Sequence, residues 1–163
     1  MLVMAMKKNC ILLFGLGVVL GFFSKLFDLY TTNLGNLFSE LSIWILIGVI
    51  ITIYSKSRKR AMIHIFLFCI GMLISYYLTA YFTSSVYSKT FIIGWNVFAC
   101  LSPFFSCLTW EVKKENFFSL VISVGILIVT ILASVILFDG PRWYDYGIFL
   151  FLIYLLFIKK KKT

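Results

Sequence analysis

Three long stretches of this sequence contain no Lys, Arg, Asp or Glu, and they limit the folds that the chain can adopt. Residues 61–82, 90–110 and 116–138 are free of these charges over 22, 21 and 23 positions. A helix of about 20 residues crosses the roughly 30 Å hydrocarbon core of a bilayer, so each stretch could span it. The chain is 62% hydrophobic and 13% charged, whereas soluble domains are nearer 45–50% and about 25%. An integral membrane protein is predicted.

Three further apolar stretches carry charge only near one end, where interfacial water can solvate it. They are residues 9–30, 37–54 and 143–158. Helices are expected throughout because lipid offers the backbone no hydrogen-bond partner. Residues 1–23 look like a signal peptide, but no small-x-small cleavage site follows, so an uncleaved first helix is expected. We predict an all-α polytopic membrane protein, one domain over residues 1–163 with six transmembrane helices in a compact bundle.

Basic residues alternate between the connections of these six helices. Twelve of the 15 Lys and Arg residues lie in the tails, in residues 55–60 or in residues 111–115, and three lie on the other side. The positive-inside rule then places both termini in the cytoplasm. Topology alone accounts for the basic runs at residues 55–60 and 159–162, although such runs are also found at lipid-headgroup sites and in nuclear signals. The net charge of +9 thus belongs to membrane flanks and not to a nucleic-acid surface.

Small residues at four-residue spacing mark faces where helices can approach closely. A proline inside an apolar helix cannot donate to the carbonyl four residues earlier, which predicts a kink and an acceptor that needs another partner. A looser stripe of Ser and Thr in residues 116–138 is expected to bond back to its own helix. The predicted packing residues are Gly17, Gly21, Gly71, Ser75, Thr79 and Pro103, and the looser stripe is Ser119, Ser123, Thr130 and Ser134.

Polar and aromatic residues collect toward the side opposite the basic loops. Lys25 and Asp28 continue the glycine face of the first predicted helix, so they should face another helix, either as a structural ion pair or as a functional site. Asn96 lies roughly 9 Å below the start of its helix. We therefore predict a water-accessible recess on the outer side, deep enough for a small solute. Its candidate ligand-binding residues are Lys25, Asp28, Glu40, Tyr76, Tyr77, Trp95, Asn96 and Arg142.

Catalytic and metal-binding motifs are not evident. His64 is the one histidine and lies within about a turn of the basic loop, where a solvated interfacial role is expected. The four cysteines predict no disulfide framework, and Cys69 shares no helix face with His64. No carboxylate pair, glycine-rich phosphate loop or HExxH motif is present. We expect no enzyme, no catalytic residue, no metal and no cofactor.

Six short motifs lie within residues 21–110. They are GFFSKLFD from Gly21, LGNLFS from Leu34, IYSKS from Ile53, FLF from Phe66, GMLISYY from Gly71 and LSPF from Leu101. On these motifs, residues 21–110 resemble a family of small bacterial membrane proteins classed only as a domain of unknown function. The resemblance implies a six-helix fold, gives no activity and suggests the plasma membrane of a bacterium.

Two classes of function fit these features. Six helices with an outer polar cluster are similar in outline to the substrate-binding subunits of vitamin-type transporters, which need a partner for energy. The first hypothesis is a small-solute binding or transport component. The alternative is a structural or partner-interaction subunit whose basic inner face meets lipid headgroups or a cytosolic partner. The bilayer is the expected partner, with a partner subunit or a homo-oligomer left open, and no nucleic acid is expected.

Overall fold

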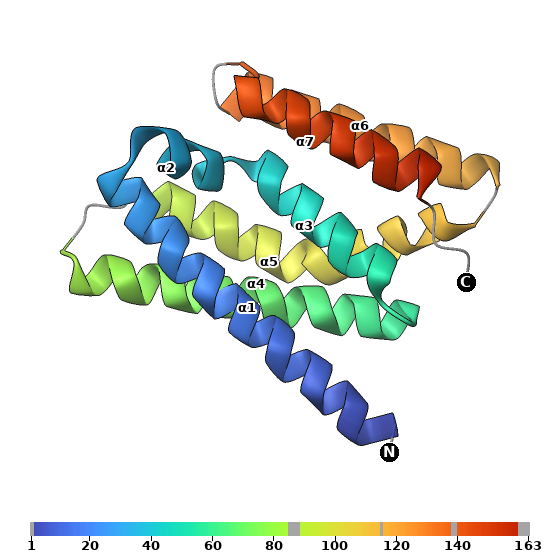
Figure 1. Cartoon of the computed structure of the whole chain (residues 1–163), viewed down its shortest axis with the longest axis horizontal. Coiled ribbons are helices and arrows are strands. Elements are labelled where there is room, and N and C mark those ends of the chain that lie inside the picture. Colours follow the sequence, from blue (N-terminus) through green and yellow to red (C-terminus); the bar gives the residue numbers. More distant parts are fainter. Residues whose placement is uncertain (1, 85–88, 115, 138–139, 160–163) are drawn as a thin grey trace.

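The computed structural model describes residues 2–84, 89–114, 116–137 and 140–159, and these ranges fold into helices with no β-strand (Figure 1). The basic residues at 160–162 lie outside the described residues. The elements are α1 (Leu2–Tyr30), α2 (Thr32–Ser39), α3 (Leu41–Tyr54), α4 (Arg58–Phe82), α5 (Lys89–Trp110), the 3-10 helix η1 (Glu111–Lys113), α6 (Phe117–Leu137), α7 (Trp143–Ile153) and the π-helical turn η2 (Tyr154–Ile158). The all-α prediction is confirmed.

Four helices in the described ranges are long and apolar enough to cross a membrane. They are the Asn9–Tyr30 part of α1, α4, the segment Ile92–Lys113, and α6. The pair α2 and α3 counts as a fifth if it crosses as one bent span. The sixth predicted span, Trp143–Ile158, is an apolar helix but rises only about 24 Å. The structure thus supports four or five candidate spans where the sequence predicted six.

The helix predicted at residues 37–54 is interrupted at Glu40. This residue has an extended backbone (φ −80°, ψ 143°), and α2 and α3 are bent by 57° there. Gly35 presses α2 against the end of α1, since a Cβ atom at Gly35 would lie 2.8 Å from the Phe27 carbonyl oxygen. Across the break, the Trp44 indole nitrogen donates to the Phe38 carbonyl oxygen at 2.8 Å. That bond satisfies a carbonyl in the last turn of α2, where helical donors are missing.

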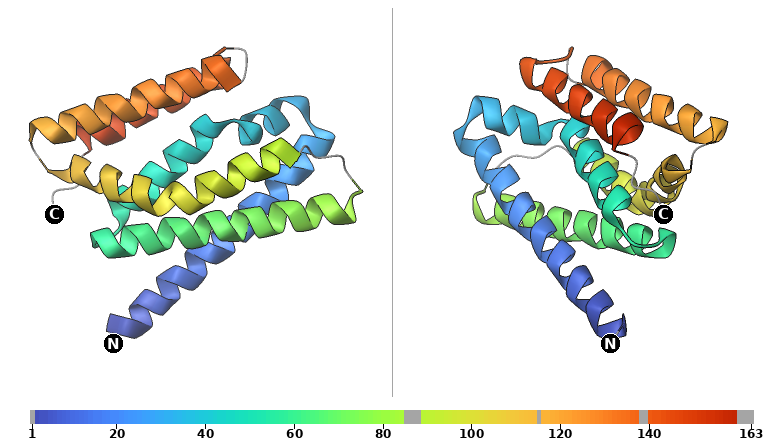
Figure 2. Two further views of the ribbon diagram at one scale, coloured as in Figure 1. Left: turned by 180° about the vertical axis from the view of Figure 1, so that it is seen from behind. Right: turned by 45° about the vertical axis from the view of Figure 1, so that its right-hand side comes forward.

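The first helix crosses α4 at the predicted glycines. A Cβ atom at Gly17 or at Gly21 would lie 2.2 Å from a backbone oxygen of α4, that of Phe68 or of Met72. On the other side of the crossing, a Cβ atom at Gly71 would lie 2.6 Å from the Phe14 oxygen. The two backbones are therefore in direct contact, as in small-xxx-small pairs. Away from this crossing, the N-terminal half of α1 diverges from the other helices (Figures 1 and 2).

Two apolar cores lie on either side of α3. One contains Trp44 of α3 together with Phe68 and Met72 of α4 and Ala99 of α5. The other joins Leu46, Val49 and Ile53 of α3 to α7 and η2. The pair α6 and α7 forms a separate layer beside α3 (Figure 2). Because α3 contributes to both cores, it connects the α1–α4–α5 layer to the α6–α7 layer.

The connections gather at two ends of the molecule. The α3–α4 connection, η1 and the C-terminal end lie together, and the α1–α2 turn and the start of α7 lie at the other end (Figure 1). We call the first the basic end. Its described charged residues are Lys56, Arg58, Lys59, Arg60, Glu111, Lys113, Lys114 and Lys159. The spatial grouping of these loops matches the alternation of charge along the sequence.

Candidate functional site

Three of the predicted ligand-binding residues form a cluster at the end opposite the basic end. Lys25 donates to Asp28 Oδ2 at 2.8 Å, and the Tyr76 hydroxyl of α4 donates to the same oxygen at 3.3 Å. The Lys25 ammonium also lies 5.2 Å from the centre of the Tyr76 ring. Lys25 is 2% exposed while the Asp28 side chain is 36% exposed. The lysine is thus buried against α4 and neutralised by a partly solvated carboxylate.

Two other predicted residues meet where α2 and α3 are bent. Arg142, just before α7, forms an ion pair with Glu40 Oε1 at 3.0 Å and also donates to the Tyr144 hydroxyl at 2.9 Å. That hydroxyl donates to Glu40 Oε1 at 2.7 Å. Hydrogen bonding to Tyr144 raises the pKa of Arg142 above its usual value, so the guanidinium stays charged. This network holds the start of α7 against Glu40, where α2 ends and α3 begins.

A second buried carboxylate belongs to the same network. The Ser42 hydroxyl donates to Asp145 Oδ1 at 2.7 Å and lies 3.4 Å from Glu40 Oε2, and the Arg142 backbone N–H donates to Asp145 Oδ2 at 2.9 Å. Glu40 and Asp145 are both 0% exposed. The expectation of no carboxylate pair is therefore wrong. The tertiary fold assembles one from residues at opposite ends of the sequence.

The remaining predicted residues are Asn96 and Trp95 on α5 and Tyr77 on α4. Asn96 is exposed, and its side-chain amide donates to the Ile92 carbonyl of its own helix at 2.8 Å. Trp95 packs edge-on against Phe98, with the ring centres 5.9 Å apart, and Tyr77 packs edge-on against Tyr76. The Asn96 amide is thus bonded to α5 itself and to neither of the two polar clusters, and a recess that reaches it stays a prediction. The polar residues form two separate, internally bonded clusters.

Pro103 lies inside α5, which continues as one helix through it. The carbonyl that it leaves without a backbone donor, that of Ala99, accepts a hydrogen bond from the Ser102 hydroxyl at 2.7 Å. The predicted need for a substitute partner is met within the same turn. The interrupted helix of this chain is α2–α3, not the proline-containing α5.

The small-residue stripes lie on buried faces. Ser75 and Thr79 are buried, and the Thr79 hydroxyl donates to the Ser75 carbonyl at 2.8 Å. On α6 the hydroxyls bond back in the same way, for example from Ser123 to the Ser119 carbonyl at 2.8 Å. Because the hydroxyl donates to a carbonyl of its own helix, it can be buried at an apolar helix–helix contact with its donor satisfied.

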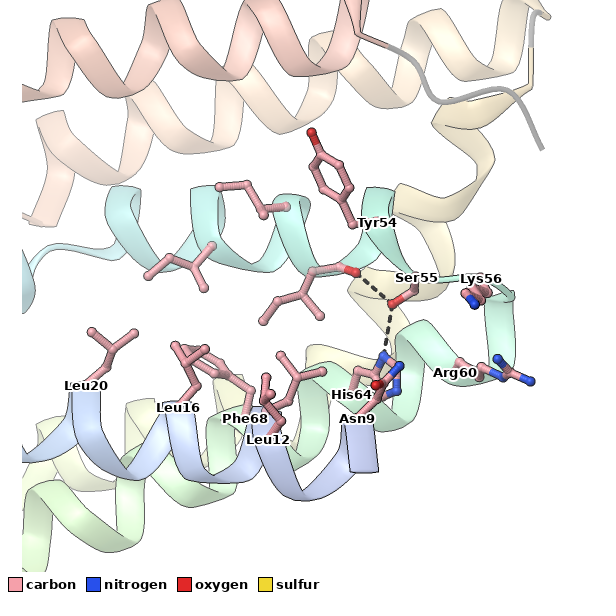
Figure 3. Close-up of a pocket in the computed structure, with 14 residues that line it drawn as sticks. Asn9, Leu12, Leu16, Leu20, Tyr54, Ser55, Lys56, Arg60, His64 and Phe68 are labelled. Carbon is pink, nitrogen blue, oxygen red and sulfur yellow. Dashed lines mark hydrogen bonds between the residues drawn. The ribbon is translucent and has the colours of Figure 1, made fainter. Parts of the chain in front are cut away.

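A groove of about 450 Å³ lies near the basic end, between the N-terminal half of α1 and the facing sides of α3 and α4 (Figure 3). This volume is within the roughly 300–1,000 Å³ typical of small-molecule sites. Apolar side chains line most of the groove, and polar side chains line one end of it. The apolar residues include Leu12, Leu16, Leu20, Ile47, Ile51 and Phe68, and those at the polar end are Asn9, Tyr54, Ser55, Lys56, Arg60 and His64.

The polar end of the groove contains the one histidine. His64 Nδ1 and the Ser55 hydroxyl are 3.1 Å apart, and that hydroxyl also lies 2.7 Å from the Ile51 carbonyl oxygen (Figure 3). His64 is buried, so the solvated interfacial role expected from the sequence is wrong. The short α3–α4 connection folds Ser55 over the first turns of α4. Lys113 holds this connection from the other side, because its ammonium donates to the Ser55 carbonyl at 2.9 Å.

Several residues of these sites were not predicted. Tyr144 and Ser42 are not among the ligand-binding residues that the sequence predicted. An acidic residue in the first turn of an apolar helix is favoured by the positive end of the helix dipole, and this signal could have placed Asp145 at the start of α7. The groove had no local signal, since it depends on the angle at which α1 leaves α4.

Among the described residues, no group of three or more His, Cys, Asp or Glu side chains could hold a metal ion. Cys10, Cys69, Cys100 and Cys107 are free thiols.

Comparison with known proteins gives one match. The sequence profile of a family described as "Family of unknown function (DUF6518)" matches residues 3–140. No curated protein and no solved structure matches the chain significantly.

Proposed function

The chain belongs to the family of unknown function DUF6518, and from the geometry of this member we propose a multi-pass membrane protein that acts through its basic end as an interaction subunit. In this proposal the protein lies in the plasma membrane of a bacterium, with the basic end and both termini in the cytoplasm. This orientation requires that the bent pair α2–α3 and the shorter helix Trp143–Ile158 each cross the membrane, in addition to the four long helices. No catalysis is part of it.

The exposed apolar surface supports the membrane location. On α6 alone, Phe117 is 80% exposed and Ile136 is 71% exposed, and large apolar side chains of α1, α4 and α5 are exposed as well. Soluble monomers rarely expose contiguous apolar patches beyond a few hundred Å². In a bilayer the same side chains contact acyl chains.

The observation that carries the proposal is the unequal pairing of charges at the two ends. At the end opposite the basic end, Lys25 and Arg142 each contact a carboxylate, whereas the exposed Lys89 at the start of α5 has no ion pair with a described carboxylate. At the basic end Glu111 contacts Arg58 at 3.5 Å and Lys114 at 2.6 Å. Within the described ranges, Lys56, Lys59 and Arg60 have no ion pair with a carboxylate. These cations remain available to an anionic group of the membrane surface or of a partner.

The proposal is tested with the full chain in nanodiscs. The thermal midpoint of unfolding is measured in phosphatidylcholine alone, in phosphatidylcholine mixed with phosphatidylglycerol, and in phosphatidylcholine with soluble polyglutamate. Anions that bind the folded basic end should raise the midpoint by a few degrees at low salt and by less at high salt. Equal midpoints in all three conditions would exclude a role for the basic end in binding anions.

A small-solute binding or transport component is the second candidate function. The observation in its favour is the helix interruption at buried Glu40, since transporters often bind substrates or ions where helices are discontinuous. It ranks second because the Glu40 carboxylate is bonded to Tyr144 and Arg142, and the Asn96 amide is bonded to its own helix.

The two candidates are separated by solute uptake into proteoliposomes that contain wild-type protein or the Glu40→Gln variant. A solute whose uptake requires the wild-type carboxylate would favour transport. Absence of uptake, with anion-dependent stabilisation retained, favours the interaction subunit.

A further inference from the structure

We infer that the groove between α1, α3 and α4 holds one acyl chain of an anionic phospholipid, whose headgroup is bound by Lys56 and Arg60. The inference rests on the proposed function, because it names the partner that the basic end binds. It goes beyond that proposal by assigning a defined site with an apolar and a charged part.

The shape of the groove is set by the close crossing of α1 and α4. Gly17 and Gly21 bring the helix backbones into contact, and toward its N-terminus α1 diverges from the other helices. Leu12, Leu16 and Leu20 follow one another at four-residue spacing and line the groove from α1 (Figure 3). Ile47 and Ile51 line it from α3. Leu12 is 63% exposed, so this wall is open to the surroundings. A long, narrow apolar slot that opens sideways fits an acyl chain.

The charge of the groove is confined to one end. Lys56 and Arg60 lie there with Asn9, Tyr54 and His64, while the side chains farther along are apolar (Figure 3). This arrangement of a cationic end and an apolar length is complementary to a lipid with a negative headgroup. In the proposed orientation, the cationic end also lies at the depth of the cytoplasmic headgroups, where each Lys or Arg contributes about 1 kcal/mol to binding anionic lipid.

A second copy of the chain fits the groove less well. Copies of one membrane protein insert in the same orientation, so a neighbour would bring its own basic end to the same depth. The cations of Lys56 and Arg60 would then face like charge. A phospholipid neutralises them and fills the apolar slot at the same time.

The test is lipid retention by the full chain in native mass spectrometry from detergent. Phosphatidylglycerol is compared with phosphatidylcholine of identical acyl chains, and glycerol phosphate serves as a headgroup without a chain. We expect one phosphatidylglycerol to bind about tenfold or more tightly than phosphatidylcholine, and glycerol phosphate should not displace it. Competition by glycerol phosphate would overturn the role of the acyl chain.

Matched variants separate the groove from the rest of the basic end. Lys56→Gln with Arg60→Gln should reduce retention about tenfold. Arg58→Gln with Lys114→Gln removes as many charges outside the groove, from two residues paired with Glu111, and should change retention little. Leu16→Trp fills the slot and should abolish retention, whereas Val19→Trp, at an exposed position of α1 outside the groove, should not. Leu12→Trp replaces Leu16→Trp should the latter not fold.

The outcomes distinguish the inference from the proposed function. A phosphatidylglycerol preference that survives Leu16→Trp and falls equally in both charge variants would overturn the groove site and leave the basic end as a headgroup-binding surface. No preference at all would overturn both. A dimer that is lost on Leu16→Trp, with no lipid bound, would show that a second copy occupies the groove.

Discussion

Lys25 illustrates how a single charge is accommodated among helices. It is almost fully buried, and its neutralising partner Asp28 is three residues away on the same helix face. Tyr76 then adds a hydroxyl and an aromatic ring from α4. The pair is therefore both a local feature of α1 and a contact between two helices.

We predict that Lys25→Met and Asp28→Leu each destabilise the protein more than the double replacement, because each single change leaves a charge without its partner. Asp28→Leu should be the worse of the two, since the lysine left behind is buried and the aspartate is partly solvated. Stability is measured by unfolding in detergent, and the coupling should be about 0.5–3 kcal/mol. Additive effects would show that the two side chains do not interact.

At the scale of the helices, Gly17 and Gly21 allow α1 to pack directly against the backbone of α4. Gly21→Ala should destabilise the protein by about 1–3 kcal/mol, since the new methyl group would meet the backbone of α4 at Met72 and cannot be accommodated by a side-chain movement. Gly15→Ala is the control, because no atom outside its own stretch of helix lies within 4 Å of the position its Cβ would take. Thermal unfolding of both variants in the same detergent gives the comparison. Equal midpoints would contradict the close crossing.

The packing of α7 on the α2–α3 bend brings the Arg142 guanidinium close to the buried carboxylates of Glu40 and Asp145. Arg142→Gln leaves Glu40 and Asp145 buried without the guanidinium, whereas Glu40→Gln leaves one cation with one carboxylate. Arg142→Gln should therefore be more destabilising, by roughly 1–2 kcal/mol after allowing for the partial exposure of Arg142. Unfolding midpoints of the two variants and of their combination test this. A larger loss in Glu40→Gln would show that the carboxylate has a role beyond balancing charge.

At the scale of the whole molecule, the proposed orientation predicts which ends are accessible from outside a cell. In a background with the four native cysteines replaced by alanine, Thr90→Cys on α5 should react with an impermeant maleimide on intact cells. Lys59→Cys at the basic end should react only after permeabilisation. Both positions are exposed. The reverse pattern would place the basic end outside and remove the proposed function.

Properties that depend on one helix at a time could be predicted from the sequence. Apolar length located the candidate spans, because a helix must be long and uncharged to cross lipid. Helical periodicity placed Gly17, Gly21 and Lys25 on one face, and that face does contact α4. The pairing of Lys25 with Asp28 follows from a spacing of three residues.

Properties that depend on how helices meet were decided only by the tertiary structure. Periodicity shows which residues share a face but not which other helix that face contacts, so it could not join Glu40 to Tyr144 or Ser42 to Asp145 across more than a hundred residues. It also could not predict the bend at Glu40, which follows from the packing of α2 on α1, or the burial of His64 beneath Ser55. The groove has the same origin. It exists because two glycines hold α1 against α4 while the N-terminal half of α1 diverges from the other helices.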